Sequence, residues 1–285
     1  MSRPRSIADR AGPAIVALAL ASLQATAADG GKGCADCHPR QAAAFERSAM
    51  ARAAVTPAFT AERADAADPR RCLRCHAPGG GRGVACGDCH GSGPHPFPPL
   101  EQPAVCARCH DAPGENTVRS FLDSPAFAAG LRCSDCHAVA DGGFNHHFRG
   151  ARSGDLLRDA ATLRAFLRSE GDRTLATVTI RHRAGHAMPG GTTGRAVWLR
   201  ISGRDEGGRE RLDRRWRFGW NRDREGRWHD RTLPPGRPVA IELPLPSAAG
   251  IRHLTIELTY RFRPGPLDTP DPDAVILDRM EIELP

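Results

Sequence analysis

The sequence has no cysteine to spare for disulfide bonds. All ten cysteines fall into five Cys-x-x-Cys pairs, and each pair is followed directly by a histidine. Structural or redox disulfides would leave these five histidines unexplained. Zinc ribbons also use Cys-x-x-Cys pairs, but four thiolates close one tetrahedral site and five pairs would leave one unmatched. The pattern therefore argues against both disulfides and structural zinc.

The five repeats are typical of covalent haem attachment. Two thiols in one turn bond to the two vinyl groups of a haem, and the adjacent imidazole becomes the proximal iron ligand. The cysteines expected to carry haem are Cys34, Cys37, Cys72, Cys75, Cys86, Cys89, Cys106, Cys109, Cys133 and Cys136. The expected proximal ligands are His38, His76, His90, His110 and His137. The sequence thus predicts five covalently bound haem c groups.

Lysine is almost absent from the chain. Of the 40 lysine and arginine residues, only Lys32 is a lysine, so we attribute the arginines to a general compositional bias and assign none of them a role. The net charge of +7 does not indicate a nucleic-acid partner, because haem propionates would offset it. The arginine-rich segment 209–231 also carries acids, and we expect it to form a solvated hairpin face.

No segment beyond the N-terminus is apolar enough to cross a membrane. The first ten residues include three arginines. An apolar stretch follows at residues 14–23, and small residues stand at 25–27. This order predicts a cleaved signal peptide at residues 1–27; an uncleaved anchor helix is the alternative. Because haem is attached covalently after export, both features predict a periplasmic or extracellular protein.

The remaining chain divides into two parts of different composition. Residues 28–150 hold all five repeats, are rich in glycine and proline and show no long apolar periodicity, so we expect haems to replace a side-chain core. Helices are expected near residues 41–53 and 117–129, the second with Pro125 as a breaker. Apolar residues at helical spacing between 153 and 170 predict a connecting helix at residues 151–170.

From residue 171 onward the chain alternates as strands do. Glycine- and proline-rich turns separate the candidate strands, which lie at 174–181, 195–202, 210–218, 239–243, 254–262 and 274–284. Six or seven short strands predict a β-sandwich over residues 171–285. The expected fold class is therefore α+β, with a haem-packed N-terminal multihaem domain of few helices followed by a C-terminal β-sandwich.

A haem that only carries electrons needs a sixth ligand, and seven histidines lie outside the repeats. His95 follows the third repeat closely in a Gly-Pro-rich segment. His146 and His147 follow the fifth repeat; at least one is expected to bind iron, with His147 favoured. His186 lies in a loop between the first two expected strands. From there it could reach a haem and lock the two domains together.

Other candidates have simpler interpretations. Met50, on the first expected helix, either binds haem iron through its thioether or packs in the core. His182 lies on a strand and is as readily a surface residue, and Met188 is expected to pack. His229 and His253 lie far from the repeats and are expected at the surface.

The repeats and their flanks resemble the multihaem cytochrome c family that includes the tetrahaem electron carrier of ammonia oxidation. The family's CxxCHGPGxxH pattern is similar to CGDCHGSGPH, which implies His95 as a distal ligand. In FERSAMARA, Met50 occupies a histidine position of the family, and Phe127 and Arg152 also stand where relatives carry histidine. The start of a C-terminal β domain in larger relatives resembles AGHAMPGGTTGRAVWL.

Three functional hypotheses remain. The leading one is an electron carrier between redox protein partners, in association with membrane electron-transfer complexes, because only nine residues separate His76 from Cys86, a span of at most roughly 35 Å. The alternative is a reductase acting on a small nitrogen or sulfur oxyanion at an open haem, although no repeat has an unusual proximal residue. The third is a structural role, in which the β domain docks partners or the units form a filament.

Overall fold

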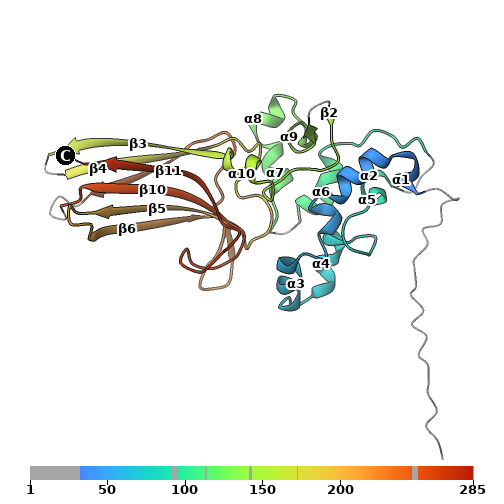
Figure 1. The fold of residues 1–285 in the computed structure, drawn as a ribbon, viewed down its shortest axis with the longest axis horizontal. Helices are drawn as coiled ribbons and strands as arrows, with labels where there is room; N and C mark the ends of the chain where they lie inside the picture. The colour runs from blue at the N-terminus through green and yellow to red at the C-terminus, as the bar shows by residue number, and fades with distance from the viewer. Residues whose placement is uncertain are drawn as a thin grey trace, which may run out of the picture.

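The computed structural model describes residues 33–91, 95–112, 114–140, 143–171, 173–245 and 250–284. The predicted signal peptide lies outside these residues. Across the described ranges, none of the helices has the length and apolar character needed to cross a membrane. Figure 1 shows the helices gathered at one end of the molecule and the long strands running away from them.

Short helices make up the first end of the molecule. They are α1 (Cys34–Cys37), α2 (Pro39–Glu46), η1 (Met50–Arg52), α3 (Pro57–Ala64), α4 (Pro69–His76), α5 (Cys86–His90), α6 (Ala104–His110), α7 (Thr117–Leu122), α8 (Pro125–Ala128), α9 (Cys133–His137) and α10 (Gly154–Arg158). Proline starts α2, α3, α4 and α8, where its missing N–H has no helical partner to lose. The helix expected at 117–129 is found as two helices divided at Pro125. The one expected at 41–53 ends early, at Glu46, and a single 3-10 turn follows.

Seven long strands form two antiparallel sheets. One has the order β11-β10-β5-β6 and the other β3-β4-β9. The strands are β3 (Ala161–Glu170), β4 (Arg173–His182), β5 (Ala196–Arg204), β6 (Glu210–Phe218), β9 (Val239–Leu245), β10 (His253–Arg261) and β11 (Val275–Glu283). All six strands expected from residue 171 onward are present, with ends that differ by at most two residues. The mixed α+β fold is therefore confirmed.

The apolar core lies between the two sheets. Val178 of β4, Leu199 of β5 and Ile256 of β10 are completely buried in one cluster, as in a β-sandwich. All described members of this cluster lie between Leu157 and Leu277. Leu157 lies in α10; within the described ranges, helices α1 to α9 contribute no residue to the cluster, which fits the expectation that cofactors fill that end.

The prediction of a connecting helix at residues 151–170 is wrong. Only α10 is helical there, and β3 pairs with β4 along its whole length. Leu163, Ala165 and Leu167 turn inward while their neighbours are exposed, because the apolar positions also satisfy a strand's period of two. The backbone N–H of Leu163 donates to the Asp278 carboxylate at 2.6 Å, which ties β3 to β11 of the other sheet.

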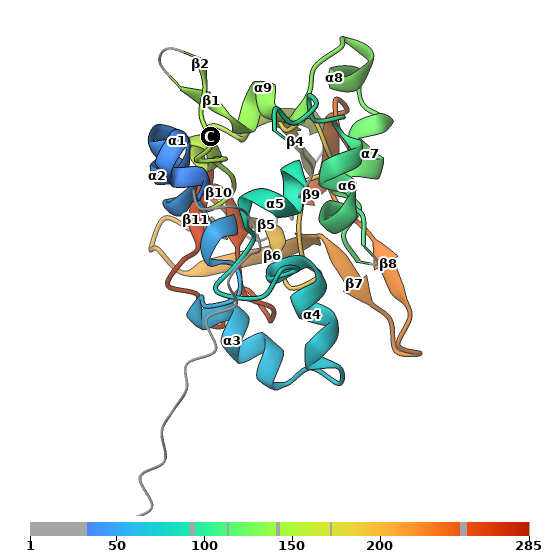
Figure 2. The same cartoon turned by 90° about the vertical axis from the view of Figure 1, so that its right-hand side faces the viewer.

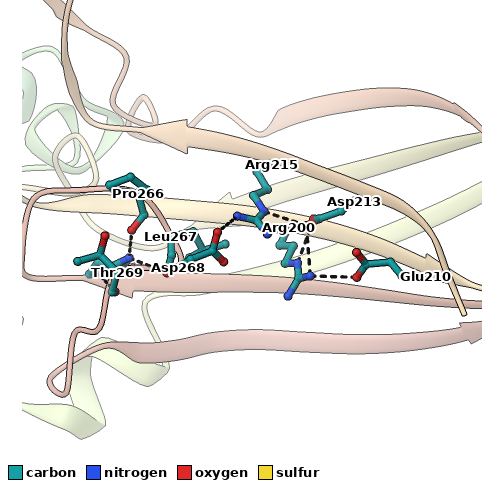
Figure 3. A network of polar contacts seen from close by, with 9 residues as sticks. Arg200, Glu210, Asp213, Arg215, Pro266, Leu267, Asp268 and Thr269 are labelled. Carbon is teal, nitrogen blue, oxygen red and sulfur yellow. Dashed lines mark hydrogen bonds and ion pairs between the residues drawn. The ribbon is translucent and has the colours of Figure 1, made fainter. Parts of the chain in front are cut away.

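The loop between β10 and β11 folds around a buried arginine. The Arg261 side chain is only 2 % exposed, and its guanidinium donates to the carbonyls of Pro266, Leu267 and Thr269 (Figure 3). The buried Asp271 carboxylate lies 3.7 Å from it and accepts the backbone N–H groups of two residues that follow β10. These contacts tie the loop to the buried guanidinium.

The outer face of the larger sheet carries ion pairs. Arg200 of β5 pairs with Asp213 and Glu210 of β6 at 3.0 and 3.1 Å (Figure 3). In the arginine-rich segment 209–231, Arg211 and Arg227 also pair with carboxylates. The segment is charged, as expected, but it is not one hairpin, because β6 pairs with β5 while residues 220–222 pair with residues 228–230. Such exposed ion pairs contribute little to stability.

A short ribbon links the strand end to the helical end. It consists of β7 (Trp220–Arg222) and β8 (Trp228–Asp230), seen beside α6 and α7 in Figure 2. The Asn116 side chain, at the start of α7, donates to the Asp230 carboxylate. The two ends of the molecule therefore share a polar contact as well as covalent continuity.

Candidate haem-binding site

Each Cys-x-x-Cys-His repeat folds as one helical turn. The first, third and fifth repeats are the short helices α1, α5 and α9, and the second and fourth are the last turns of α4 and α6. Residues three apart in a helix share one face, so each turn presents its two thiols together. All ten cysteines are described, and none forms a disulfide.

An aspartate caps three of these turns. In the CADCH, CGDCH and CSDCH repeats, the aspartate carboxylate accepts the backbone N–H of the residue before the first cysteine. The pairs are Asp36 with Gly33 at 2.8 Å, Asp88 with Ala85 at 2.7 Å and Asp135 with Arg132 at 2.9 Å. The analysis of the sequence missed this role, although the recurring CxDCH pattern signals it.

The two remaining repeats, CLRCH and CARCH, carry arginine at the same position. The helix of the second repeat is capped instead by Asp68, whose carboxylate accepts the N–H groups of Arg70 and Arg71 at 3.1 and 3.3 Å. The helix of the fourth repeat begins after Pro103, and no side chain caps it. Three of the five turns are thus capped by an aspartate of their own repeat, and the other two are not.

Thiols of different repeats lie side by side. Burial and the neighbouring Cys34 thiol raise the pKa of Cys86, and burial and the neighbouring Cys75 thiol raise that of Cys109 to about 11. The neighbouring Cys133 thiol and burial raise the pKa of Cys106. The first repeat therefore adjoins the third, the second adjoins the fourth, and the fourth adjoins the fifth.

Backbone contacts support the same arrangement. The Arg108 guanidinium of the fourth repeat donates to the Asp88 carbonyl of the third at 3.3 Å. The Gln102 side chain, just before the fourth repeat, accepts the N–H of Ser134 in the fifth at 3.1 Å. The fourth repeat thus contacts the second, the third and the fifth.

Three proximal candidates face a second histidine ring. The ring centres are 5.6 Å apart for His38 and His95, 6.4 Å for His90 and His146, and 6.2 Å for His137 and His186. Metal–imidazole bonds are about 2.0–2.1 Å long, so two histidines on opposite sides of one ion place their ring centres about 6 Å apart. The spacing of all three pairs therefore suits an iron between the rings.

The structure favours His146 over His147, contrary to the preference drawn from the sequence. The ring facing His90 belongs to His146, whereas the backbone N–H of His147 donates to the Asn145 side chain at 2.8 Å. The other two candidates, His95 and His186, each face a proximal histidine.

His186 is carried to the helical end by the loop after β4. The N–H of Ala187 donates to the Ser120 hydroxyl at 2.9 Å, and the N–H of Gly191 donates to the Thr117 hydroxyl at 3.3 Å, so α7 holds the loop at two points. His186 Nδ1 donates to the Ala187 carbonyl at 2.9 Å, which leaves Nε2 free. Burial lowers the pKa of His186 to about 4, so the ring is neutral, as metal ligation requires.

Among the described residues, the proximal rings of the second and fourth repeats have no facing histidine. His76 Nδ1 donates to the Ala53 carbonyl at 3.0 Å, and Phe59 stacks on its ring at 4.1 Å. His110 Nδ1 lies 3.6 Å from the Glu115 carboxylate. In the part of the chain that the structure describes, no second histidine ring faces either of them.

The other candidates lie elsewhere. Met50 is half-buried in η1, where its carbonyl accepts the N–H of Val84, and Met188 is buried in the sandwich core, as expected. His182 is buried, not at the surface, and its Nε2 donates to the Pro234 carbonyl at 2.8 Å. His229 and His253 are exposed, as expected.

Haem fits these residues. Paired thiols one turn apart provide the attachment points, and imidazoles held through Nδ1 offer Nε2 to iron. The described helices α1 to α9 contribute no side chain to the apolar core, so the haems would supply the packing between these helices.

Comparisons with known proteins agree with this site. Residues 33–91, which hold the first three repeats, match the family model described as cytochrome c554 and c-prime. Among solved structures, the chain is similar to a penta-haem cytochrome c552 from Thermochromatium tepidum, with a TM-score of 0.66 and 19% identity over 88% of this chain and 97% of that one. That likeness shows a shared fold. A search of the curated proteins found no match.

The five repeats and the family match over residues 33–91 support a multihaem c-type cytochrome, in agreement with the resemblance seen in the sequence. The solved structure adds a shared fold. Haem c is accordingly its cofactor.

Proposed function

We propose that the protein is a periplasmic or extracellular electron carrier with five covalently bound haem c groups. The observation that supports this most directly is the set of three facing histidine pairs. An iron with an imidazole on each side has no free position for a substrate, so it is suited to electron transfer alone. The penta-haem protein from Thermochromatium tepidum, whose fold this chain shares, supports the number of haems.

The haem supplies reversible one-electron chemistry when bound. The chain's own residues hold the ligands in place. The Nδ1 atoms of His76 and His137 donate to the backbone carbonyls of Ala53 and Arg149, which fixes the tautomer that offers Nε2 to iron. Because these carbonyls belong to the folded backbone, the rings keep one orientation when the charge of the site changes.

The contacts between repeats support a branched route for electrons. The third, second and fifth repeats all adjoin the fourth, and the first joins through the third. We propose that electrons entering at any repeat pass through the fourth to reach the others. The donor and the acceptor are other redox proteins, including membrane electron-transfer complexes.

A second function is favoured by one observation. His76 and His110 have no facing histidine among the described residues, so the haems of the second or fourth repeat would have a free or weakly held position. An open haem could bind and reduce a small nitrogen or sulfur oxyanion. This reductase activity is the alternative to a pure carrier.

Intact-mass and ligand-binding measurements on the exported protein test both functions. The carrier predicts a polypeptide that begins after residue 27 and carries five haem masses. A mass with fewer haems would contradict it. Carbon monoxide added to the fully reduced protein separates the two functions: no spectral change favours the carrier, and binding to one or two haems favours the reductase.

A further inference from the structure

The fourth repeat differs from two others in what lies behind its histidine. The Nδ1 atoms of His76 and His137 face neutral backbone carbonyls. His110 Nδ1 faces the carboxylate of Glu115, at 3.6 Å. This separation is longer than a hydrogen bond, but it is within the range of an ion pair. The group behind this histidine is therefore a carboxylate.

Glu115 is held in that position by its surroundings. Its side chain is only 14 % exposed, and the Thr117 hydroxyl donates to the same oxygen, Oε1, at 2.7 Å. The carboxylate is therefore held beside His110 by its packing and by the Thr117 hydroxyl.

We propose that Glu115 is a positioning residue for His110, and that its negative charge lowers the reduction potential of the haem attached to Cys106 and Cys109. A carboxylate beside Nδ1 attracts the proton on that nitrogen and so makes the imidazole a stronger donor to iron. The extra negative charge stabilises ferric iron over ferrous iron. This inference rests on the proposed function, since it assumes a haem on the fourth repeat.

The location of this haem gives the effect a consequence. The fourth repeat adjoins the second, third and fifth repeats. A lowered potential at this junction makes the haem of the fourth repeat hold an electron less strongly. Electrons therefore pass from it to the surrounding haems. Glu115 would thereby disfavour storage of charge at the branch point.

Glu115→Gln tests the inference, because it removes the charge and keeps the size of the side chain. We expect one haem to shift about tenfold toward the ferrous form at a given potential, which is about 59 mV for a one-electron couple. The other four haems should be unaffected. The matched control is Glu101→Gln, at an exposed carboxylate that precedes α6. It should shift no haem by a comparable amount.

Glu115→Asp gives a second test, because it keeps the charge and shortens the side chain. The same haem should shift much less than in Glu115→Gln, since the negative charge remains near His110. Redox titrations followed by electron paramagnetic resonance resolve the individual haems. Five unshifted potentials in Glu115→Gln, equal shifts in Glu115→Asp and Glu115→Gln, or equal shifts in the Glu101 control, would overturn the role of the Glu115 charge. The haem count of each variant keeps this outcome separate from failure of the proposed function, which would show as missing haem.

Discussion

The rings of His137 and His186 lie nearly parallel, at an interplanar angle of 14° and 6.2 Å apart, although they belong to opposite ends of the fold. His137 ends the last Cys-x-x-Cys-His repeat, and His186 follows the second strand of the sandwich. A haem iron between them would join the two ends of the molecule. The sandwich therefore has a direct part in the cofactor site, as a supplier of a ligand.

His186→Ala should remove one bis-histidine haem and weaken the attachment of the sandwich to the helices. We expect one haem to become high-spin or to bind carbon monoxide. Limited proteolysis should cut the chain between the two ends faster than in the native protein. His253→Ala, at an exposed position on β10, is the control and should change neither property. An unaltered spectrum in His186→Ala would show that this residue is no ligand.

The adjacent histidines His146 and His147 should respond differently to substitution. Only the ring of His146 faces His90. His146→Ala should therefore convert one low-spin haem, whereas His147→Ala should leave the haem spectrum as it is. Electron paramagnetic resonance of the oxidised proteins distinguishes the two variants. The reverse pattern would restore the preference for His147 that the sequence suggested.

Loss of an aspartate cap should weaken the repeat that it closes. Asp88→Ala removes the acceptor for the Ala85 N–H, a change that typically costs about 0.5–2 kcal/mol. We expect a lower melting temperature and less complete haem loading at Cys86 and Cys89, measured by calorimetry and by peptide mass mapping. Asp65→Ala, an exposed aspartate after α3, should have little effect on either measurement. Equal losses in both variants would argue against a capping role.

Two arginines that contact the same carboxylate should differ greatly in their effect on stability. Arg261→Ala removes the buried cation beside the buried Asp271 carboxylate and the donor to the carbonyls of Leu267 and Thr269; loss of one partner of a buried ion pair typically costs about 3–5 kcal/mol. Arg263 also lies near Asp271, at 3.8 Å, but its side chain is 51 % exposed. Arg263→Ala should therefore cost less than about 1 kcal/mol. Chemical denaturation of both variants measures the difference, and similar midpoints would contradict this account.

The strands were predictable because alternation is a local property. Residues 210–218 alternate in the sequence and form β6 over the same range. The segment 161–170 misled because Leu163 and Leu167 are four residues apart, a spacing that suits one face of a helix and also one face of a strand. Pairing with β4, which lies further along the chain, decided between the two.

The ligand pairs were only half predictable for a similar reason. The repeats identify the proximal histidines by local spacing, but the distal partner is chosen by the fold. His95 follows the third repeat and yet faces His38 of the first, and His146 follows the fifth repeat and faces His90 of the third. Proximity in the sequence therefore indicated which histidines could be distal ligands. It did not indicate which proximal histidine each of them faces.

Near-infrared magnetic circular dichroism of the oxidised protein tests the central claim most directly, because it reports the axial ligands of each low-spin haem. The three facing histidine pairs predict that at least three of five haems show bis-histidine ligation. A spectrum with fewer than three bis-histidine haems would contradict the account.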